Sequence, residues 1–340
     1  TIMVASILAR LRQALQDSGY AVQTLRIATP PPREMSVPVP PADRLSLALQ
    51  LEAECFVYGI DYAAIGPALP DEPDGYAVIP DVLASTENVF ASGLFADLDG
   101  GVSLSAARDC AQVISRSASV SADGMANMRF AALANVPPGV PFFPAAYHRG
   151  GAPLIAIATE AAGLAVDALR EVPSLATARR RLVSMIEAHG AALSRVGQRI
   201  ASESEIQFIG IDFSLAPFPE QSRSLGAAME SLGVPAVGLA GSLAAAAFLT
   251  DCLDQAEFPR TGFCGLLLPP LEDDTLAARA ADGQLTLTDL LLYSSVCGTG
   301  LDTIPLPGDA SPEALSAVLI DLGALALRLN KPLTARLMPI

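Results

Sequence analysis

Hydrophobic residues recur along this chain at two spacings, one typical of helices and one typical of buried strands. Near the start, Val4, Leu8, Leu11 and Leu15 fall on one face of a helix. Short apolar runs that stop at Pro or Gly, such as residues 262–268, are typical of strands. Helices are expected over residues 3–18, 43–55, 156–170, 174–201, 243–253, 285–294 and 312–329, and from Ser103. Strands are expected over residues 21–28, 62–66, 88–95, 125–136, 206–215, 262–268 and 333–338.

This alternation of helices and strands continues along the whole chain. It predicts an α/β fold with a buried parallel or mixed sheet, since alternating elements of this kind build such sheets. No change in composition separates two halves. We therefore expect one α/β domain of barrel type over residues 1–340.

Composition and charge narrow the range of partners. The chain has 340 residues, of which 51% are hydrophobic and 17% charged, so it is too apolar to be disordered throughout. Its formal net charge is −15, which argues against nucleic acid and against anionic membranes as partners. The bases are all Arg except Lys331, and this excludes chemistry that requires several lysines.

The five cysteines indicate reduced thiols in the cytoplasm. Their number is odd, they lie far apart and no CxxC occurs, so neither a disulfide framework nor a zinc site is expected. No secretory signal is visible in a chain that opens on Thr1. The longest uncharged run, residues 231–250, contains Pro235 and is interpreted as part of a core helix, not as a membrane span.

Two polar residues in apolar surroundings are candidates for chemistry. Asp212 lies between Ile211 and Phe213 in a predicted strand, where an unpaired carboxylate would cost roughly 1–3 kcal/mol. It either caps backbone N–H groups at a turn or belongs to a site. Cys297 precedes a Gly-Thr-Gly sequence that could present its thiol, although most free cysteines are small buried hydrophobes.

Among the histidines and cations, His148 follows Tyr147 in a Pro/Phe-rich loop and is a better acid/base candidate than His189, which lies in a predicted helix. Lys331 and Arg129 could together form an anion pocket, but Lys331 could equally be a cation at a helix end. The run Arg179 to Arg181 is most simply a solvated helix face.

Several motifs resemble a prokaryotic family of proteins, domain of unknown function 711, in order and over nearly the whole chain. The matching segments are residues 66–69, 86–90, 129–132, 135–139, 141–148, 211–217, 297–303, 305–309 and 331–336. The resemblance implies a closed ten-stranded α/β barrel of the pyruvate formate-lyase-like type, with a Cys-bearing hairpin loop inside. Cys297 would be the tip of that loop, and both Thr1 and Ile340 would be cut edges. The radical-glycine motif of glycyl radical enzymes is not found, so radical chemistry is not predicted.

Two functions follow as alternatives. The first is a non-radical enzyme for a small anionic metabolite, a carboxylate or acyl compound, with Cys297 as nucleophile or proton donor and with Asp212, Asp302 and His148 as acid/base or orienting groups. The predicted substrate-binding residues are Asn88, Arg129, Asn135, Tyr147, Ser214, Thr299, Lys331 and Arg336. The second is a non-catalytic binding or regulatory protein with the same pocket.

No cofactor is predicted. A Mg or Ca ion held by Asp212, Asp302 or Asp309 ranks last among the possibilities, because the spacing of these residues gives it no support. An apolar helix face over residues 239–248 could form a homodimer interface or part of the core.

Overall fold

A computed structural model describes residues 2–121 and 123–340 of the chain. Its helices are α1 (Ile2–Asp17), α2 (Arg44–Tyr58), α3 (Pro73–Ala77), α4 (Ile79–Ser85), α5 (Leu104–Ser117), α6 (Ala162–Leu169), α7 (Leu175–Glu203), α8 (Leu225–Ser231), α9 (Ser242–Gln255), α10 (Asp274–Ala281), α11 (Leu287–Ser294) and α12 (Pro312–Leu329). The strands are β1 (Arg26–Ala28), β2 (Tyr62–Ala64), β3 (Val89–Asp97), β4 (Gly101–Val102), β5 (Phe130–Ala134), β6 (Leu154–Ala158), β7 (Gln207–Asp212), β8 (Gly300–Leu306) and β9 (Leu333–Pro339).

The strands form one large sheet and one small one. The large sheet has the order β1-β2-β3-β5-β9-β8, with β4 paired to the end of β3. Strands β1, β2, β3 and β5 are parallel, β9 is antiparallel to β5, and β8 is parallel to β9. The small sheet consists of the parallel pair β6 and β7. The α/β prediction is therefore confirmed as a mixed, mostly parallel sheet.

The strand pairings of the described residues do not close a ring, so the expected closed ten-stranded barrel is not found among them. Residues 262–268, expected to be a strand, instead make an isolated bridge in which Leu266 pairs with Leu215, just after β7. A second isolated bridge pairs Arg260 with Ile211 of β7. On the other side of the small sheet, β6 and β1 share no ladder. The large sheet is open at β1.

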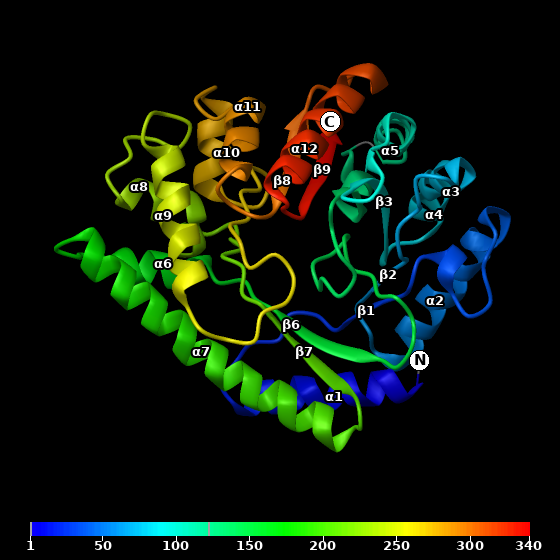
Figure 1. Ribbon diagram of the computed structural model, residues 1–340, viewed down its shortest axis with the longest axis horizontal. Coiled ribbons are helices and arrows are strands. Elements are labelled where there is room, and N and C mark those ends of the chain that lie inside the picture. Colours follow the sequence, from blue (N-terminus) through cyan, green and yellow to red (C-terminus); the bar gives the residue numbers. More distant parts are fainter. Residues whose placement is uncertain (1, 122) are drawn as a thin grey trace.

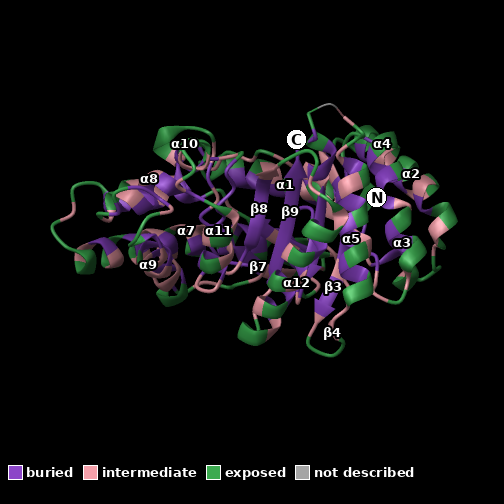
Figure 2. Ribbon diagram, turned by 90° about the horizontal axis from the view of Figure 1, so that it is seen from above, coloured by how far each residue is buried: buried purple, intermediate pink, exposed green. Residues whose placement is uncertain are grey.

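The helices lie around the outside of the strands and of the loops between them (Figure 1). Seen from above, strands β3, β8 and β9 of the large sheet are mostly buried and the outer helix faces are exposed (Figure 2). Every residue of β5 is buried, as expected for a central parallel strand covered on both faces. At α7, Gly197 allows the Phe208 ring of β7 to pack where a Cβ would collide with it.

Several helices begin where the sequence predicts, because a capping side chain marks the first turn of each. Ser103 accepts from the Ala106 N–H at the start of α5, and Ser311 accepts from the Ala314 N–H at the start of α12. Helix α12 has the predicted bounds, with Pro312 at its first position and Asn330 in a left-handed conformation at its end.

Three segments differ from the predictions. A helix was expected from residue 156, but residues 154–158 form β6, because a run of five apolar residues suits a strand and a helix equally well. The expected loop over residues 297–309 contains β8. The first part of the strand expected over residues 125–136 is a 3-10 helix, Met125–Arg129, which follows a left-handed Gly124.

Candidate functional site

A cluster of charged side chains lies where β8, β9 and the loop before α10 meet. Arg336, in the middle of β9, is 6% exposed. Its Nε donates to Oδ1 of Asp302 on β8, and its Nη2 donates to Oε1 of Glu272 at 3.1 Å. Burial opposes the charge of Arg336, but the two carboxylates more than offset this and leave its pKa raised. The guanidinium is thus held as a buried cation by two acids.

A bulge in β8 directs Asp302 towards this cation. Leu301 pairs with Ala335 and Ile304 pairs with Leu337, so Asp302 and Thr303 both stand opposite Arg336 alone. Thr303 has φ of 41°, a left-handed conformation that is unfavourable for a β-branched residue. Asp302 is 1% exposed, and its Oδ2 has no hydrogen-bond partner among the described residues. Strain and an unsatisfied carboxylate oxygen therefore coincide at one point of the sheet.

A second guanidinium, that of Arg26 at the start of β1, lies over two aromatic rings. It is 5.5 Å from the centroid of Tyr62 and 5.3 Å from the centroid of Phe143. The neighbouring Phe142 lies 5.3 Å from the guanidinium of Arg336, so adjacent residues of one loop contact both cations. In the part of the chain that the structure describes, Arg26 has no ion pair, and its Nε donates to Thr24 at 2.8 Å.

Glu160, just after β6, completes the cluster. Its Oε2 accepts from Nε2 of Gln23 at 2.6 Å, and this hydrogen bond joins the chain beside β1 to the chain beside β6. Desolvation lowers the pKa of Arg26, while Glu160 and Glu272 act in the opposite direction. Burial raises the pKa of Glu272, and Arg336 opposes that rise. We call Arg26, Glu160, Glu272, Asp302 and Arg336 the central charge cluster.

A hollow of about 500 Å³ lies next to the Arg26 rings, at the amino ends of β1 and β2. Tyr62 belongs to its wall as well as to the pair of rings around Arg26. Glu52 and Asn88 also line it, and Oε1 of Glu52 accepts from the Asn88 N–H at 2.7 Å. Its volume falls within the range of small-molecule sites.

Comparison with known proteins places this fold in a family. The family model described as "Uncharacterised ACR (DUF711)" matches residues 2–340. The chain belongs to the DUF711 family. It is 32% identical over 352 residues to a UPF0210 protein of Pyrobaculum arsenaticum, covering 97% of this chain and 77% of that one. It is 30% identical over 344 residues to a UPF0210 protein of Syntrophobacter fumaroxidans, covering 95% of this chain and 75% of the relative.

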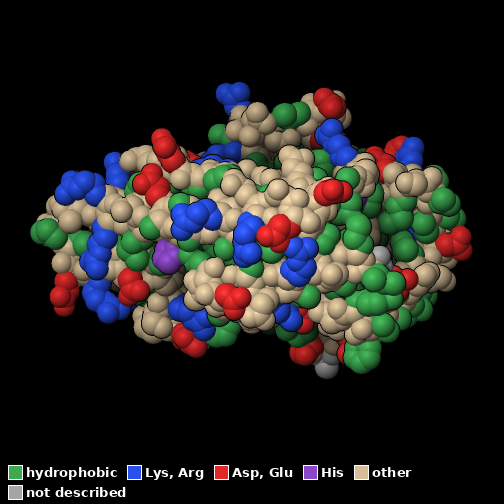
Figure 3. Space-filling model, turned by 90° about the horizontal axis from the view of Figure 1, so that it is seen from below, with side chains coloured by type: hydrophobic (Ala, Val, Ile, Leu, Met, Phe, Trp, Pro, Cys, Tyr) green, Lys and Arg blue, Asp and Glu red, His purple; other side chains and the backbone are tan. Residues whose placement is uncertain are grey.

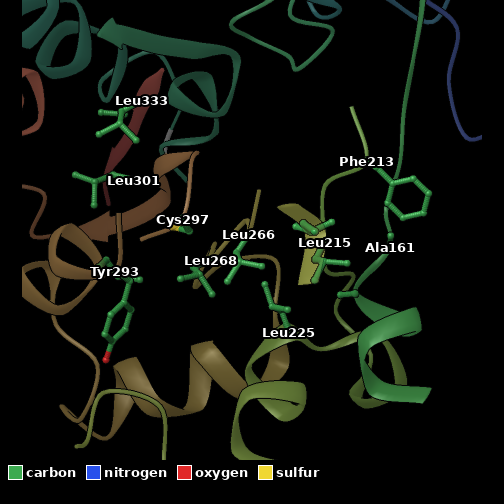
Figure 4. Close-up of a cluster of buried hydrophobic side chains, with 14 of the residues drawn as sticks. Ala161, Phe213, Leu215, Leu225, Leu266, Leu268, Tyr293, Cys297, Leu301 and Leu333 are labelled. Atoms are coloured by element: carbon green, nitrogen blue, oxygen red, sulfur yellow. The ribbon is translucent and has the colours of Figure 1, made fainter. Parts of the chain in front are cut away.

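In this DUF711 chain the thiol of Cys297 lies in the hydrophobic core, not inside a ring of strands as expected. Cys297 is 1% exposed and packs in the turn between α11 and β8 (Figure 4). Its neighbours in that view include Leu266, Leu268 and Leu301. Burial raises the pKa of the thiol to about 11, which disfavours the nucleophilic thiolate. A pocket built around this sulfur is not formed.

Asp212 anchors a loop. Its carboxylate accepts from the backbone N–H groups of Phe263 and Cys264, at 3.0 and 2.9 Å, and from the hydroxyl of Ser214. Burial raises the pKa of Asp212, and these three hydrogen bonds oppose that rise. Its carboxylate and the Ser214 hydroxyl are thus engaged in holding residues 262–265, since Ser214 also accepts from the Gly265 N–H.

Arg129 and Lys331 do not meet. Arg129 donates to the carbonyls of Leu83 and Val89, at 2.6 and 3.1 Å, and so ties the end of α4 to β3. Lys331 donates to the Ser295 carbonyl at 3.0 Å, on the α11 side. The predicted anion pocket between these two cations is absent from the described structure.

The other predicted binding residues are scattered. Asn135 donates towards Asn330, and the Tyr147 hydroxyl donates to the Val136 carbonyl at 2.8 Å. Nδ1 of His148 accepts from the Gly150 N–H, and Thr299 donates to the Leu266 carbonyl. Tyr147 and His148 thus hold their own loop, whereas Asn135 and Thr299 link distant segments of the chain.

The arginine run on α7 belongs to a solvated face. Figure 3 shows the side of the molecule that carries α1 and α7, where basic and acidic side chains are interspersed. Arg179 pairs with Asp251 at 2.8 Å, and Arg181 donates to the Arg170 carbonyl.

No metal site is evident among residues 2–121 and 123–340, where no three His, Cys, Asp or Glu side chains lie together suitably for an ion. Asp212 and Asp302 have the partners described above, and Asp309 is exposed in a turn, so the three acids do not converge. Across the same residues, no helix combines the length and apolar character needed to cross a bilayer.

Of the predicted residues, the structure brings Asp302 and Arg336 together in the central charge cluster, and it separately brings Ser214 to Asp212. The sequence analysis missed Arg26, Glu160 and Glu272. Arg26 opens a strand of three residues, Glu160 follows a segment expected to be helical, and Glu272 lies in a loop. The one available signal was a charged residue at or just after an apolar run. Charged residues in that position are common in proteins and usually lie on the surface, so the signal does not distinguish a site.

Proposed function

We propose that this protein binds a small carboxylate-bearing metabolite at the central charge cluster, with Arg26 holding the carboxylate. The observation that carries the proposal is the guanidinium of Arg26, which lies over the rings of Tyr62 and Phe143 without an ion-pair partner among the described residues. Its Nε donates to Thr24, and a guanidinium has four further N–H donors that can bind a planar anion.

The surroundings of Arg26 suit a ligand better than those of Arg336. Arg26 is solvent-accessible, whereas Arg336 is buried and already neutralised by Asp302. Phe143, whose ring lies 5.3 Å from the Arg26 guanidinium, is itself buried, so that side of the cation faces a ring and not open water. Desolvation correspondingly lowers the pKa of Arg26. The hollow beside Tyr62 offers space for the rest of the molecule.

We also infer that the two sheets are parts of one barrel-like wall, as in the pyruvate formate-lyase-like fold. Leu266 supports this, because it forms a bridge with Leu215 after β7 and its carbonyl accepts from Thr299 before β8. On the opposite side, the Gln23–Glu160 hydrogen bond spans the interval between β1 and β6.

An enzyme is the second candidate. Glu272 favours it, because a carboxyl group with a raised pKa beside a fixed cation can carry a proton. In that case Glu272 would exchange a proton with the bound metabolite, and Arg336 would orient it. The burial of Cys297 gives no support to thiol chemistry.

The test is ligand binding by the intact chain and by Arg26→Gln. Thermal unfolding is followed with acetate, succinate and glycine as probes, and isothermal titration is used for any probe that stabilises. We expect at least one probe to stabilise the parent protein and Arg26→Gln to lose about tenfold or more in affinity. Arg180→Gln, an exposed cation on α7, is the matched control and should bind normally. Equal binding by Arg26→Gln and the parent contradicts the proposal.

A further inference from the structure

We infer that the ligand of the central charge cluster is a zwitterion of the α-amino acid class, with its carboxylate on Arg26 and its ammonium group on Glu160 and Glu272. This inference rests on the proposed function and adds the second charge of the ligand. It follows from the contacts that surround Arg26 and from the balance of charge in the cluster.

Glu160 and Glu272 are each held near Arg26 through other residues. Glu160 is held by Gln23, three residues before Arg26 in the same extended segment. Glu272 is held by Arg336, whose guanidinium lies over Phe142, and the next residue, Phe143, lies under Arg26. Both carboxylates also act on the charge of Arg26.

The formal charge of the cluster is unsuited to an anion alone. Two arginines stand against three carboxylates, so the cluster carries one net negative charge before any ligand arrives. Asp302 already neutralises Arg336, and Glu272 contacts the same guanidinium. A ligand with only a carboxylate would satisfy Arg26 but would be repelled by Glu160 and Glu272. A zwitterion offers a carboxylate to Arg26 and an ammonium group to Glu160 and Glu272, and it leaves the net charge of the cluster unchanged.

Both acids retain acceptor capacity for an ammonium group. Glu160 is exposed, with one hydrogen bond to Oε2 from Gln23. Glu272 receives Arg336 on Oε1, and its side chain is 35% exposed. A carboxylate has about four acceptor positions, so each can accept from a further N–H donor.

The experiment compares three probes of nearly equal size, L-alanine, L-lactate and propionate, by isothermal titration against the intact chain. They share a carboxylate and differ in carrying an ammonium group, a hydroxyl group or neither. We expect L-alanine to bind at least about tenfold more tightly than L-lactate or propionate. Glu160→Gln and Glu272→Gln should each weaken L-alanine binding and reduce this preference. Glu257→Gln, an exposed acid elsewhere, should change nothing.

The outcomes separate this inference from the proposed function. If L-lactate or propionate binds as tightly as L-alanine and Arg26→Gln abolishes binding, the carboxylate site stands and the zwitterion is refuted. If L-alanine binds but Glu160→Gln and Glu272→Gln leave the preference intact, the assignment of the ammonium partner is refuted. If no probe binds at millimolar concentration, both proposals fail. Circular dichroism spectra of each variant confirm that the protein is folded.

Discussion

Removing the buried cation of the central charge cluster should cost far more stability than removing an exposed one. In Arg336→Met, the carboxylate of Asp302 stays 1% exposed and loses its ion-pair partner. Its second oxygen already has no partner in the described structure, so nothing compensates for the loss. Breaking a buried pair from one side costs about 3–5 kcal/mol. Glu272 also loses a donor but can be hydrated, since its side chain is 35% exposed.

The assay is reversible urea unfolding followed by circular dichroism, with a thermal scan beside it. For a chain of 340 residues, the unfolding entropy is about 0.7 kcal/mol per degree, so the predicted loss lowers Tm by about 4–7 °C. The matched control is Arg170→Met, which breaks an exposed pair with Asp167 at 3.0 Å. It should change stability by less than about 1 kcal/mol.

A double variant distinguishes an unpaired charge from lost packing. Arg336→Met combined with Asp302→Asn removes both charges of the pair, so it should recover much of the stability lost in the single variant. If the single variant is as stable as the Arg170→Met control, the pair contributes nothing and the reasoning is refuted. If the double variant is as unstable as the single one, the loss arises from packing instead of charge.

Two further predictions concern the loop held by Asp212 and the thiol of Cys297. Gly262 has φ of +71°, and a Cβ there would overlap the Asp212 carboxylate. Gly233 also has a positive φ, +93°, but has open space around it and serves as the control. We therefore expect Gly262→Ala to lower the free energy of unfolding by at least about 2 kcal/mol more than Gly233→Ala does. Equal losses of stability in urea would contradict this. A thiol pKa of about 11 in place of 9.0 reduces the thiolate fraction of Cys297 at neutral pH about a hundredfold. Iodoacetamide should therefore modify Cys297 at least about a hundredfold more slowly in the folded protein than in the urea-unfolded protein. Mass spectrometry of the peptide measures both rates, and fast labelling of the folded protein would show that the thiol is accessible.

The sequence was sufficient for the fold class because the signals involved are local. Capping residues such as Ser311 and the long apolar periodicity of residues 312–329 fixed the bounds of α12. The same reasoning failed for β6, because the apolar residues 154–158 lack an alternating pattern and were read as the start of a helix. The signal for a strand was the group of turn residues just before them, Gly150, Gly151 and Pro153.

The site was less predictable because it depends on contacts between distant segments. Asp302 and Arg336 were both among the predicted site residues, and the β8 bulge brings them together. Asp212 was singled out as a polar residue in an apolar strand, but its carboxylate binds the backbone N–H groups of residues 263 and 264, which is the other interpretation that the sequence allowed. The role of Arg26 depends on Tyr62 and Phe143, which lie 36 and 117 positions further along the chain. No local sequence pattern predicts contacts between residues that far apart.

The interval between β1 and β6 has a consequence for association. In the described residues, β1 pairs only with β2, and β6 pairs only with β7, so each strand has one side whose backbone N–H and C=O groups lack a ladder partner. Unpaired strand sides of this kind are templates for an incoming extended peptide. Because no ladder crosses this interval, a peptide that paired with β1 or β6 would displace no native strand and would meet only side-chain contacts such as Gln23–Glu160.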